Sequence, residues 1–357
     1  MSELAWRSIL VTGGCGFIGS NFIRYMLGRY QNLQVVNLDK LTYCGNLANL
    51  VDLSGDPRYI FVQGDIARPE DVKRALKLGP AEVVVNFAAE THVDRALLSP
   101  GVFVQTDVFG TYTLLEAARQ CGVKRYLQVS SDEVYGPVLT GRAREEDPLR
   151  PHNPYAASKA GAELLTQAYY ASFGFPTLIT RGANTIGPYQ YPEKIVPLFI
   201  TNALDDLPLP VYGNGGAVRD YLYVTDHCRA VDLVLQRGEP GEIYNVGTGQ
   251  EITGIQVAQA ILELLDKPPS LLRFVQDRPG HDRRYAVDAS KLRGLGWEPV
   301  YGFQEALAQT VQWYVANEPW WRPLKSGEFQ AYYLQQYGER LRQALLNTGA
   351  GGGQRLG

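Results

Sequence analysis

The sequence predicts an α/β fold in which a doubly wound parallel sheet is followed by a smaller C-terminal domain. Over the first half of the chain, short β-branched and apolar runs alternate with helical patterns, without internal repeats. This alternation is typical of βαβ units, whose right-handed crossovers bring the carboxyl ends of the strands to one edge of the sheet. Glycine-rich or polar segments follow several of these strands, so we expect one ligand cleft at that edge.

The composition fits a large globular protein and excludes several other classes. The chain has 357 residues, of which 45% are hydrophobic and 20% charged, so it can bury a sizeable core. A net charge of −3 gives no general attraction to nucleic acid or membranes, and no run reaches the roughly 18 apolar residues of a membrane span. We expect a cytoplasmic protein with a small-molecule partner. Neither a disulfide framework nor a metal site is expected, because the four cysteines are scattered: Cys15, Cys44, Cys121 and Cys228.

A glycine-rich turn follows the first predicted strand, residues 8–12. Gly13, Gly16 and Gly19 open a helix predicted over 20–30. Such a turn lets the backbone approach a pyrophosphate, which then lies at the helix N-terminus. An ordinary strand–turn–helix is the alternative. The candidate cofactor-binding residues of this turn are Gly13, Gly16, Phe17, Ile18 and Gly19.

An acid ends the second predicted strand, residues 33–39. Asp39 stands where nucleotide-binding folds place the carboxylate that holds the adenosine ribose hydroxyls. Because this carboxylate would repel a 2′-phosphate, it favours NAD over NADP, and only the neighbouring Lys40 weakens the argument. A solvated turn acid is the alternative interpretation of Asp39.

Two more strands are predicted over 59–64 and 82–87, with a helix at 69–78 between them. The first of these strands is followed directly by Asp65 and Ile66. Both residues are placed to meet the adenine edge of a dinucleotide.

Small residues leave the strand that ends at residue 87, as they must if a cofactor lies against Ala88 and Ala89. Nearby, His92 could be a ligand or a base, although a loop histidine among polar groups is more often a hydrogen-bonding scaffold. Residues 100–120 predict a long helix whose exposed apolar side is either a dimer contact or core. A fifth strand, 124–130, follows.

The chemistry is predicted where this fifth strand ends, at Ser131, Asp132 and Glu133. Tyr155 begins a further helix, and Lys159 lies one turn later on the same face. A lysine beside a tyrosine stabilises the phenolate and lowers its pKa towards the working pH, as a base acting on an alcohol requires. We therefore expect oxidation of a hydroxyl group in the cleft.

The periodicity changes after residue 181, which marks the expected domain border. We expect an NAD-binding domain over 1–181, a mainly substrate-binding domain over 182–340 and a disordered tail over 341–357. Within the second domain, residues 210–221 and 277–284 contain arginines set in glycine turns. Such arginines suit bidentate phosphate contact, with solvated loops as the alternative.

These motifs resemble the extended short-chain dehydrogenases/reductases that act on nucleotide sugars, a Rossmann-like class with TGGxGFIG near the start and YxxxK after a serine-ended strand. More narrowly, the chain is similar from residue 8 to about 330 to the dTDP-glucose 4,6-dehydratase family. The segments that carry the narrower likeness are residues 41–47, 89–94, 131–136, 187–194, 219–224 and 278–282. Its most specific element is the Asp132-Glu133 pair directly after the active-site hydroxyl.

The resemblance implies a hydro-lyase that converts dTDP-glucose to dTDP-4-keto-6-deoxyglucose, a step of deoxysugar biosynthesis. Tyr155, supported by Lys159 and with Ser131 holding the hydroxyl, would take the O4 proton while hydride passes from C4 to NAD. Asp132 as acid and Glu133 as base would then remove water across C5 and C6, and the hydride would return to C6. Two adjacent carboxyls suit both roles, because like charges at close range raise one pKa. NAD would stay bound and be regenerated each turn, in a homodimer formed through the two long helices of the first domain.

The resemblance also implies which residues bind the two ligands. The implied cofactor-binding residues are Gly13, Gly16, Phe17, Ile18, Gly19, Asp39, Lys40, Leu41, Thr42, Asp65, Ile66, Phe87, Ala88, Ala89, Thr91, Thr106, Tyr155, Lys159 and Thr185. The implied substrate-binding residues are Thr91, Ser131, Asp132, Glu133, Asn184, Glu193, Lys194, Ile195, Pro210, Val211, Tyr212, Arg219, Asn245, Arg278 and His281. No residue is assigned to a metal.

Three positions depart from the family pattern. Thr185 stands where a second asparagine near the nicotinamide is more usual, which leaves a hydroxyl in place of an amide. Gly254 stands where a substrate-binding asparagine is expected, so a polar contact is missing and the nucleotide preference is open between thymidine and uridine. Ser131 replaces the more usual threonine and keeps the hydroxyl.

Two alternative functions stay open at this point. A nucleotide-sugar 4-epimerase shares the tyrosine, lysine, hydroxyl and NAD, but it needs no acid and base near C5 and C6. A catalytically silent NAD-binding regulator would be expected to lose Tyr155, Lys159 or the acid pair, and all of them are present.

Overall fold

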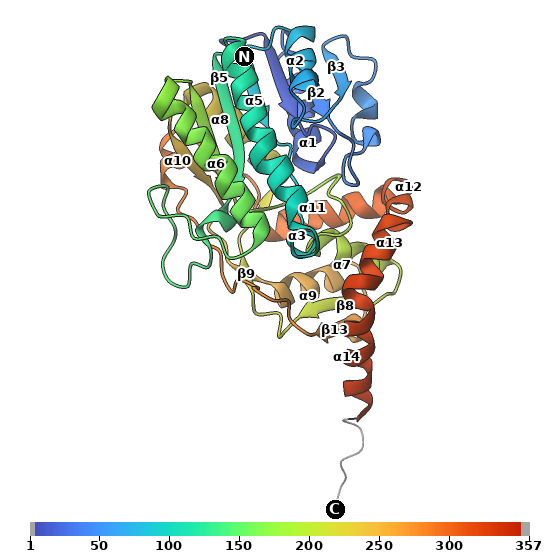
Figure 1. Ribbon diagram of the computed structural model, residues 1–357. Helices are drawn as coiled ribbons and strands as arrows, with labels where there is room; N and C mark the ends of the chain where they lie inside the picture. The colour runs from blue at the N-terminus through green and yellow to red at the C-terminus, as the bar shows by residue number, and fades with distance from the viewer. Residues whose placement is uncertain (1–3, 351–357) are drawn as a thin grey trace, which may run out of the picture.

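The computed structural model describes residues 4–350, and its centre is a seven-stranded parallel sheet (Figure 1). The strand order is β11-β6-β5-β4-β1-β2-β3, so the chain reverses its direction across the sheet between β1 and β4. This confirms the doubly wound parallel sheet. The strands of the sheet are β1 Ser8–Thr12, β2 Gln34–Asp39, β3 Tyr59–Gln63, β4 Val83–Asn86, β5 Arg125–Ser131, β6 Thr177–Gly182 and β11 Ile243–Val246.

Helices cover both faces of this sheet, because successive residues of each buried strand point to opposite sides. In β1, Ile9 and Val11 pack in one core with α1 and α8, whereas Leu10 packs in another with α2, α5 and α6 (Figure 1). The five helices are α1 Phe17–Arg29, α8 Val224–Arg237, α2 Pro69–Leu78, α5 Gly110–Gln120 and α6 Pro154–Phe173.

A second core lies beyond the carboxyl edge of the sheet and contains Phe199, Tyr221, Ile261 and Trp321. The chain does not pass into this layer once and stay there, since α8 and β11 return to the first sheet. The division at residue 181 therefore remains a prediction. The main elements of the second layer are β7 Asn184–Ile186, α7 Ile195–Leu204, β8 Leu209–Tyr212, β9 Val218–Arg219, β10 Tyr221–Tyr223, β12 Ile252–Thr253, α9 Gly254–Leu264, β13 Leu272–Val275 and α11 Phe303–Ala316.

Short elements connect these layers, and a helical segment ends the described chain. The connecting elements are η1 Leu47–Leu53, α3 Val93–Leu98, α4 Pro100–Phe103, η2 Val104–Phe109, η3 Asp132–Tyr135, η4 Pro269–Leu271, α10 Ser290–Gly294, α12 Glu318–Trp321 and η5 Pro323–Lys325. The final segment is α13 Glu328–Tyr333, η6 Leu334–Gly338 and α14 Glu339–Ala350, with α14 projecting from the body (Figure 1).

Two predicted elements differ from the structure. The helix expected over 100–120 is continuous but contains a π-helical turn, Val104–Phe109, between α4 and α5. Residues 341–350, expected within a disordered tail, belong to helix α14, whose Leu341 packs against the second core; the rest of that tail, 351–357, lies outside the described residues. Within residues 4–350, no helix is long and apolar enough to cross a membrane.

Candidate active site

A cavity of about 260 Å³ opens at the carboxyl edge of the sheet, where the sequence predicts the cofactor. With the exception of Leu41, every predicted cofactor-binding residue lines it, from Gly13 after β1 to Thr185 in β7. Leu41 is engaged locally, since it adopts a φ of 58° and its backbone N–H donates to Asp39 at 2.8 Å. The wall also contains His227 and Gln190, to which the sequence pattern assigned no role.

The glycine turn fits a pyrophosphate because it leaves no room for side chains. A Cβ on Gly13 would lie 2.7 Å from the Cα of Ala88, and one on Gly19 would lie 2.4 Å from the carbonyl oxygen of Gly13. Helix α1 begins at Phe17 with no side-chain cap, so no capping side chain competes with an anion for its first backbone N–H groups.

The end of β2 fits an unphosphorylated ribose. The Asp39 carboxylate accepts the backbone N–H of Cys15 at 2.8 Å, and burial raises its pKa above the usual value. Lys40, which weakened the prediction of NAD over NADP, is paired with Asp65 at 2.7 Å. Its charge is therefore already neutralised by a carboxylate of the same cavity.

The five predicted catalytic residues all line this cavity. Strand β5 ends at Ser131, whose hydroxyl caps the following turn by accepting the backbone N–H of Glu133 at 3.3 Å and donates to Asp132 at 3.2 Å. The Glu133 carboxylate accepts hydrogen bonds from Asn153 and Tyr285, both at 3.2 Å. The two acids thus differ in surroundings, with Glu133 hydrogen-bonded to the protein and Asp132 more deeply enclosed.

Asp132 is a neutral acid at pH 7. Burial and the neighbouring Glu133 raise its pKa to about 8, against the opposing charge of Arg219. The residue is 3% exposed, and its Oδ2 atom is buried without a hydrogen-bond partner. A protonated carboxyl with a free oxygen in the wall of a cavity is suited to donate a proton to a bound ligand.

The pKa of Tyr155 is raised in the structure, whereas the sequence predicts a lowered value. Burial and the charge of Glu133 raise the pKa of Tyr155 above its usual value, and a hydrogen bond with Ser131 opposes the rise. Lys159 was predicted to stabilise the Tyr155 phenolate. In the structure its ammonium donates a hydrogen bond to the Val129 carbonyl at 2.7 Å. Lys159 is itself buried, which lowers its pKa against the nearby charge of Asp107.

Asp107 is a buried acid beside the site that the sequence pattern did not reveal, and it lines neither cavity. It lies in the π-helical turn and accepts the backbone N–H of Glu90 at 2.9 Å and the hydroxyl of Ser158 at 2.5 Å. Burial raises its pKa to about 6, against the opposing charge of Lys159. The only available signal was indirect, because π-helical turns inside α-helices are frequent at functional sites but carry no fixed motif.

A second cavity of about 150 Å³ adjoins the first and lies in the second layer. Four residues line both cavities, namely Glu133, Asn184, Glu193 and Lys194. The predicted substrate residues Ile195, Pro210, Val211, Tyr212, Arg219, Arg278 and His281 line the second cavity alone, whereas Thr91, Ser131 and Asp132 line only the first.

Asn245 is the predicted substrate residue that the structure places elsewhere. It lies in β11 at one edge of the sheet and lines neither cavity. Its side-chain amide donates to two backbone carbonyls, and its Oδ1 accepts the hydroxyl of Tyr135 at 2.8 Å. Because these bonds occupy both ends of the amide, we assign Asn245 a structural role.

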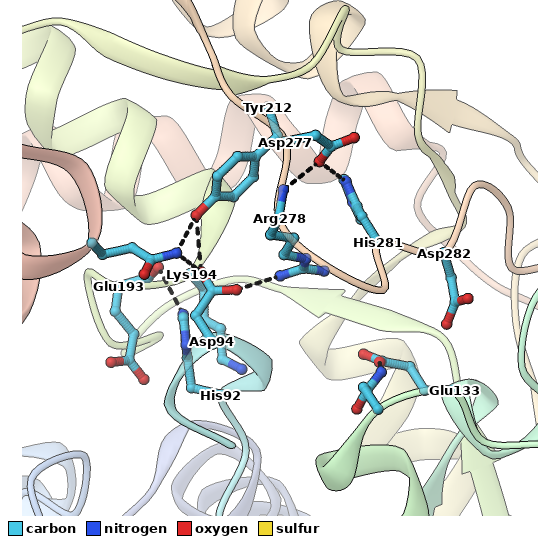
Figure 2. A network of polar contacts seen from close by, with 12 residues as sticks. His92, Asp94, Glu133, Glu193, Lys194, Tyr212, Asp277, Arg278, His281 and Asp282 are labelled. Carbon is cyan, nitrogen blue, oxygen red and sulfur yellow. Dashed lines mark hydrogen bonds and ion pairs between the residues drawn. The ribbon is translucent and has the colours of Figure 1, made fainter. Parts of the chain in front are cut away.

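Asp94 joins distant segments around the second cavity (Figure 2). Its carboxylate accepts hydrogen bonds from Arg278 at 2.9 Å, Tyr212 at 3.0 Å and Gln336 at 3.0 Å. Burial opposes ionisation of Asp94, but the Arg278 guanidinium holds its pKa below the usual value. Asp94 belongs to one of the segments that carry the family resemblance, but the sequence did not indicate that it pairs with Arg278, 184 residues away.

Glu193 and Lys194 form the boundary between the cavities. Glu193 accepts hydrogen bonds from Tyr43 at 2.6 Å and from Arg95 at 2.8 Å. Lys194 donates to the Thr91 carbonyl, and burial lowers its pKa. His92 contacts the Glu193 carbonyl through Nε2 at 3.3 Å, as a scaffold residue would. Within residues 4–350, no three metal-ligating side chains are grouped together.

Comparisons with known proteins agree with this geometry. The family model for GDP-mannose 4,6 dehydratase matches residues 10–310. The dTDP-glucose 4,6-dehydratase of Xanthomonas campestris pv. campestris (strain B100) is 48% identical over 341 residues, covering 90% of this chain and 97% of that protein.

Two solved structures extend the comparison. The DesIV dTDP-glucose 4,6-dehydratase of Streptomyces venezuelae, solved with NAD and TYD bound, is 48% identical with a TM-score of 0.86 and covers 89% of this chain and 100% of its own. The UDP-glucose 4-epimerase of Thermus thermophilus, solved with NAD, is 35% identical with a TM-score of 0.81 and covers 87% of this chain and 99% of its own. The chain thus belongs to the dTDP-glucose 4,6-dehydratase family of extended short-chain dehydrogenases/reductases.

Proposed function

We propose that this protein is an NAD-dependent hydro-lyase that converts dTDP-glucose to dTDP-4-keto-6-deoxyglucose. The observation that carries the proposal is the Asp132–Glu133 pair, in which Glu133 lines both cavities and Asp132 has a raised pKa that favours its protonated form near neutral pH. Relatives at 48% identity with this activity in their names support the same conclusion.

We assign the first cavity to NAD. The turn at Gly13 would hold the pyrophosphate, Asp39 the adenosine ribose, and the end of β5 the nicotinamide. When bound, NAD supplies reversible hydride transfer and a positive charge that favours the Tyr155 phenolate. Two related proteins whose structures were solved with NAD bound support this assignment.

The protein's own groups account for the proton movements. Tyr155 takes the proton of the sugar O4, while the hydroxyl of Ser131 hydrogen-bonds the same oxygen. Once C4 is a ketone, the hydrogen on C5 is acidic, and Glu133 removes it. Asp132, protonated at pH 7, donates a proton to the departing C6 hydroxyl, which leaves as water. Glu133 can return its proton to C5 at the end of the cycle.

We assign the second cavity to the nucleotide part of the substrate. Arg219 and Arg278 line it and have the donor geometry that diphosphates require. Arg219 is held in place by its bond to the Asp282 carbonyl at 2.9 Å and by stacking on Tyr285. Gly254 also lines this cavity, and a Cβ there would meet only ordinary contacts, so the missing asparagine leaves space beside the ligand.

We further propose a homodimer in a reducing, cytoplasmic compartment. The helical segment from α4 to α5 and the adjacent α6 expose large apolar side chains, with Val104 56%, Phe109 44%, Leu164 55% and Phe173 56% exposed. A paired apolar face of this kind suits a subunit contact. All four cysteines are free thiols, which fits a reducing compartment. Light scattering should give twice the chain mass, and Leu164→Glu should reduce it.

The activity is tested by proton NMR of dTDP-glucose incubated with the protein in D₂O. We expect a new 6-deoxy methyl signal and deuterium at C5. A galactose signal would instead establish the 4-epimerase, which the acid pair disfavours. No change, even with added NAD and with UDP- and CDP-glucose as substrates, would overturn the proposal.

A further inference from the structure

One side of the first cavity presents two buried polar atoms that no residue within 4–350 uses. His227 lines the cavity and is 1% exposed, and its Nε2 atom is buried without a partner. Gln190 lines the same cavity and is 8% exposed, and its Oε1 is likewise buried without a partner. Buried polar atoms left unsatisfied in a cavity wall indicate the polarity of the ligand that belongs there.

Thr185 is the hydrogen-bond partner of His227. Its hydroxyl has one proton and lies 3.2 Å from the Ala183 carbonyl and 2.9 Å from Nδ1 of His227. When the proton is donated to the carbonyl, the hydroxyl oxygen can only accept from His227, and the imidazole proton is then on Nδ1. Burial lowers the pKa of His227 to about 4, so the ring is neutral, and with its proton on Nδ1 it presents Nε2 as an acceptor.

The same threonine also orients Gln190. The Gln190 Nε2 donates to the Thr185 carbonyl at 2.9 Å, which turns Oε1 into the cavity as an acceptor. The side chain and backbone of Thr185 thus arrange two acceptors on one wall.

This wall lies beside the reacting groups. Ser131 at the end of β5 pairs in register with Gly182 at the end of β6. The absence of a side chain on Gly182 makes room for the histidine, since a Cβ there would lie 2.8 Å from Cε1 and 3.2 Å from Nε2 of His227. A nicotinamide bound for hydride exchange at Ser131 and Tyr155 would lie in the part of the cavity that this wall borders.

We propose that His227 Nε2 and Gln190 Oε1 accept hydrogen bonds from the carboxamide NH₂ of the nicotinamide, and that Thr185 is the positioning residue that makes His227 an acceptor. The inference rests on the proposed function, because it takes NAD as the ligand of the first cavity. As a consequence, the site would bind a dinucleotide with a carboxamide NH₂ group more tightly than one that lacks this group.

The test is a competition between NAD and 3-acetylpyridine adenine dinucleotide, in which a methyl group replaces the NH₂. The purified holoenzyme is equilibrated with both, and the bound dinucleotides are released and counted by mass spectrometry. We expect the wild type to favour NAD. In His227→Asn, which retains a donor near Nδ1 but lacks the Nε2 acceptor, this preference should fall about 5- to 50-fold, the usual effect of leaving a buried donor unpaired.

His227→Gln is the matched control, since its amide oxygen can reach the position of Nε2 and should retain most of the preference. A His227→Asn variant that keeps the wild-type preference, or that weakens both dinucleotides equally, would overturn the inference while leaving the proposed activity intact. A wild type that holds neither dinucleotide would overturn the proposed function as well.

A second pair of variants tests the role of Thr185 and does not require His227 to change. Thr185→Ser keeps the hydroxyl and should keep the Nδ1–H tautomer, whereas Thr185→Val removes the acceptor and should shift the tautomer and lower the NAD preference. Nitrogen-15 NMR of histidine-labelled protein reads the tautomer directly. An unchanged His227 signal in Thr185→Val would contradict the positioning role.

Discussion

The two cavities meet at Glu133 but are built in different ways. The first is formed by the ends of consecutive strands, and its closest approaches involve backbone and small residues, such as Gly13 against Ala88. The second is assembled from segments far apart in the chain and depends on charged side chains, with Asp94 and Arg278 at its centre (Figure 2).

This difference determines what a mutation does to each cavity. A backbone-lined site tolerates changes at its side chains but not added bulk, because atoms already lie within 3 Å of the glycine positions. A site held by a buried ion pair depends on both partners, and removing one leaves an uncompensated charge that costs about 3 to 5 kcal/mol. Cofactor binding should therefore be robust to charge substitutions that severely weaken substrate binding.

The largest effect is expected where the cavities meet. Glu133→Gln removes the base for C5 and should lower kcat by about 10²- to 10⁴-fold. Asp132→Asn removes the acid and should lower kcat by a similar factor. Bound NAD, measured by mass spectrometry, should be unchanged in both, because neither group belongs to the turn or to the ribose site. Unimpaired turnover of either variant would remove that residue from its role.

A smaller effect is expected at the second cavity, where a substitution should weaken substrate binding without changing NAD binding. Asp94→Asn leaves the Arg278 guanidinium without its buried carboxylate, so we expect KM for dTDP-glucose to rise about 10- to 100-fold with NAD content unchanged. Asp277→Asn is the control, since this carboxylate contacts His281 at 2.7 Å but is 51% exposed and should change KM less than about threefold. An equal rise in KM in the two variants would contradict the conclusion that the Asp94–Arg278 ion pair holds the second cavity together.

The pH profile tests the protonated state of Asp132. As its pKa is raised to about 8, the acid form predominates below that pH and is lost as pH rises through it. We expect kcat/KM to fall above pH 8, by about tenfold per pH unit. In Asp132→Asn this alkaline limb should be absent at a lower overall rate. A wild-type profile that stays flat to pH 9.5 would contradict the assignment of Asp132 as the acid.

The smallest effect concerns the choice between NAD and NADP. Asp65→Asn releases the half-exposed Lys40 from its 2.7 Å ion pair, and the free ammonium can then attract a 2′-phosphate. Since such pairs are worth about 0.2 to 1 kcal/mol, the affinity ratio of NADP to NAD should rise no more than about fivefold. Equilibrium competition measures this ratio, and a larger rise would mean that Asp39 contributes little to the discrimination.

The first cavity could be predicted from the sequence because its information is local. The glycine turn, Asp39 and the serine-ended strand each lie within a few residues of a strand end, and parallel strands bring those ends together. Burial is the largest cause of the raised pKa of Asp132, but the second cause, the charge of Glu133, could be predicted because the two acids are neighbours in the chain. Among the predicted cofactor-binding residues, Leu41, which has a positive φ, is the one that does not line the cavity.

The rest depended on long-range packing. The raised pKa of Tyr155 reflects burial and the approach of Glu133, neither of which the YxxxK spacing contains. The family resemblance predicted that Asn245 binds the substrate. Because β11 belongs to the seven-stranded sheet, the Asn245 side-chain amide instead donates to the Ala143 carbonyl. The acceptor wall at His227 likewise requires Gly182 and Thr185, which lie more than forty residues earlier.

In the proposed cycle, one site oxidises C4, eliminates water and returns the same hydride to C6. NMR of the product formed from dTDP-glucose deuterated at C4, with no NAD added, follows this hydride. The deuterium should appear in the C6 methyl group of the product while C5 exchanges with solvent. Label that is lost to solvent, or retained at C4 of a galactose epimer, would contradict it.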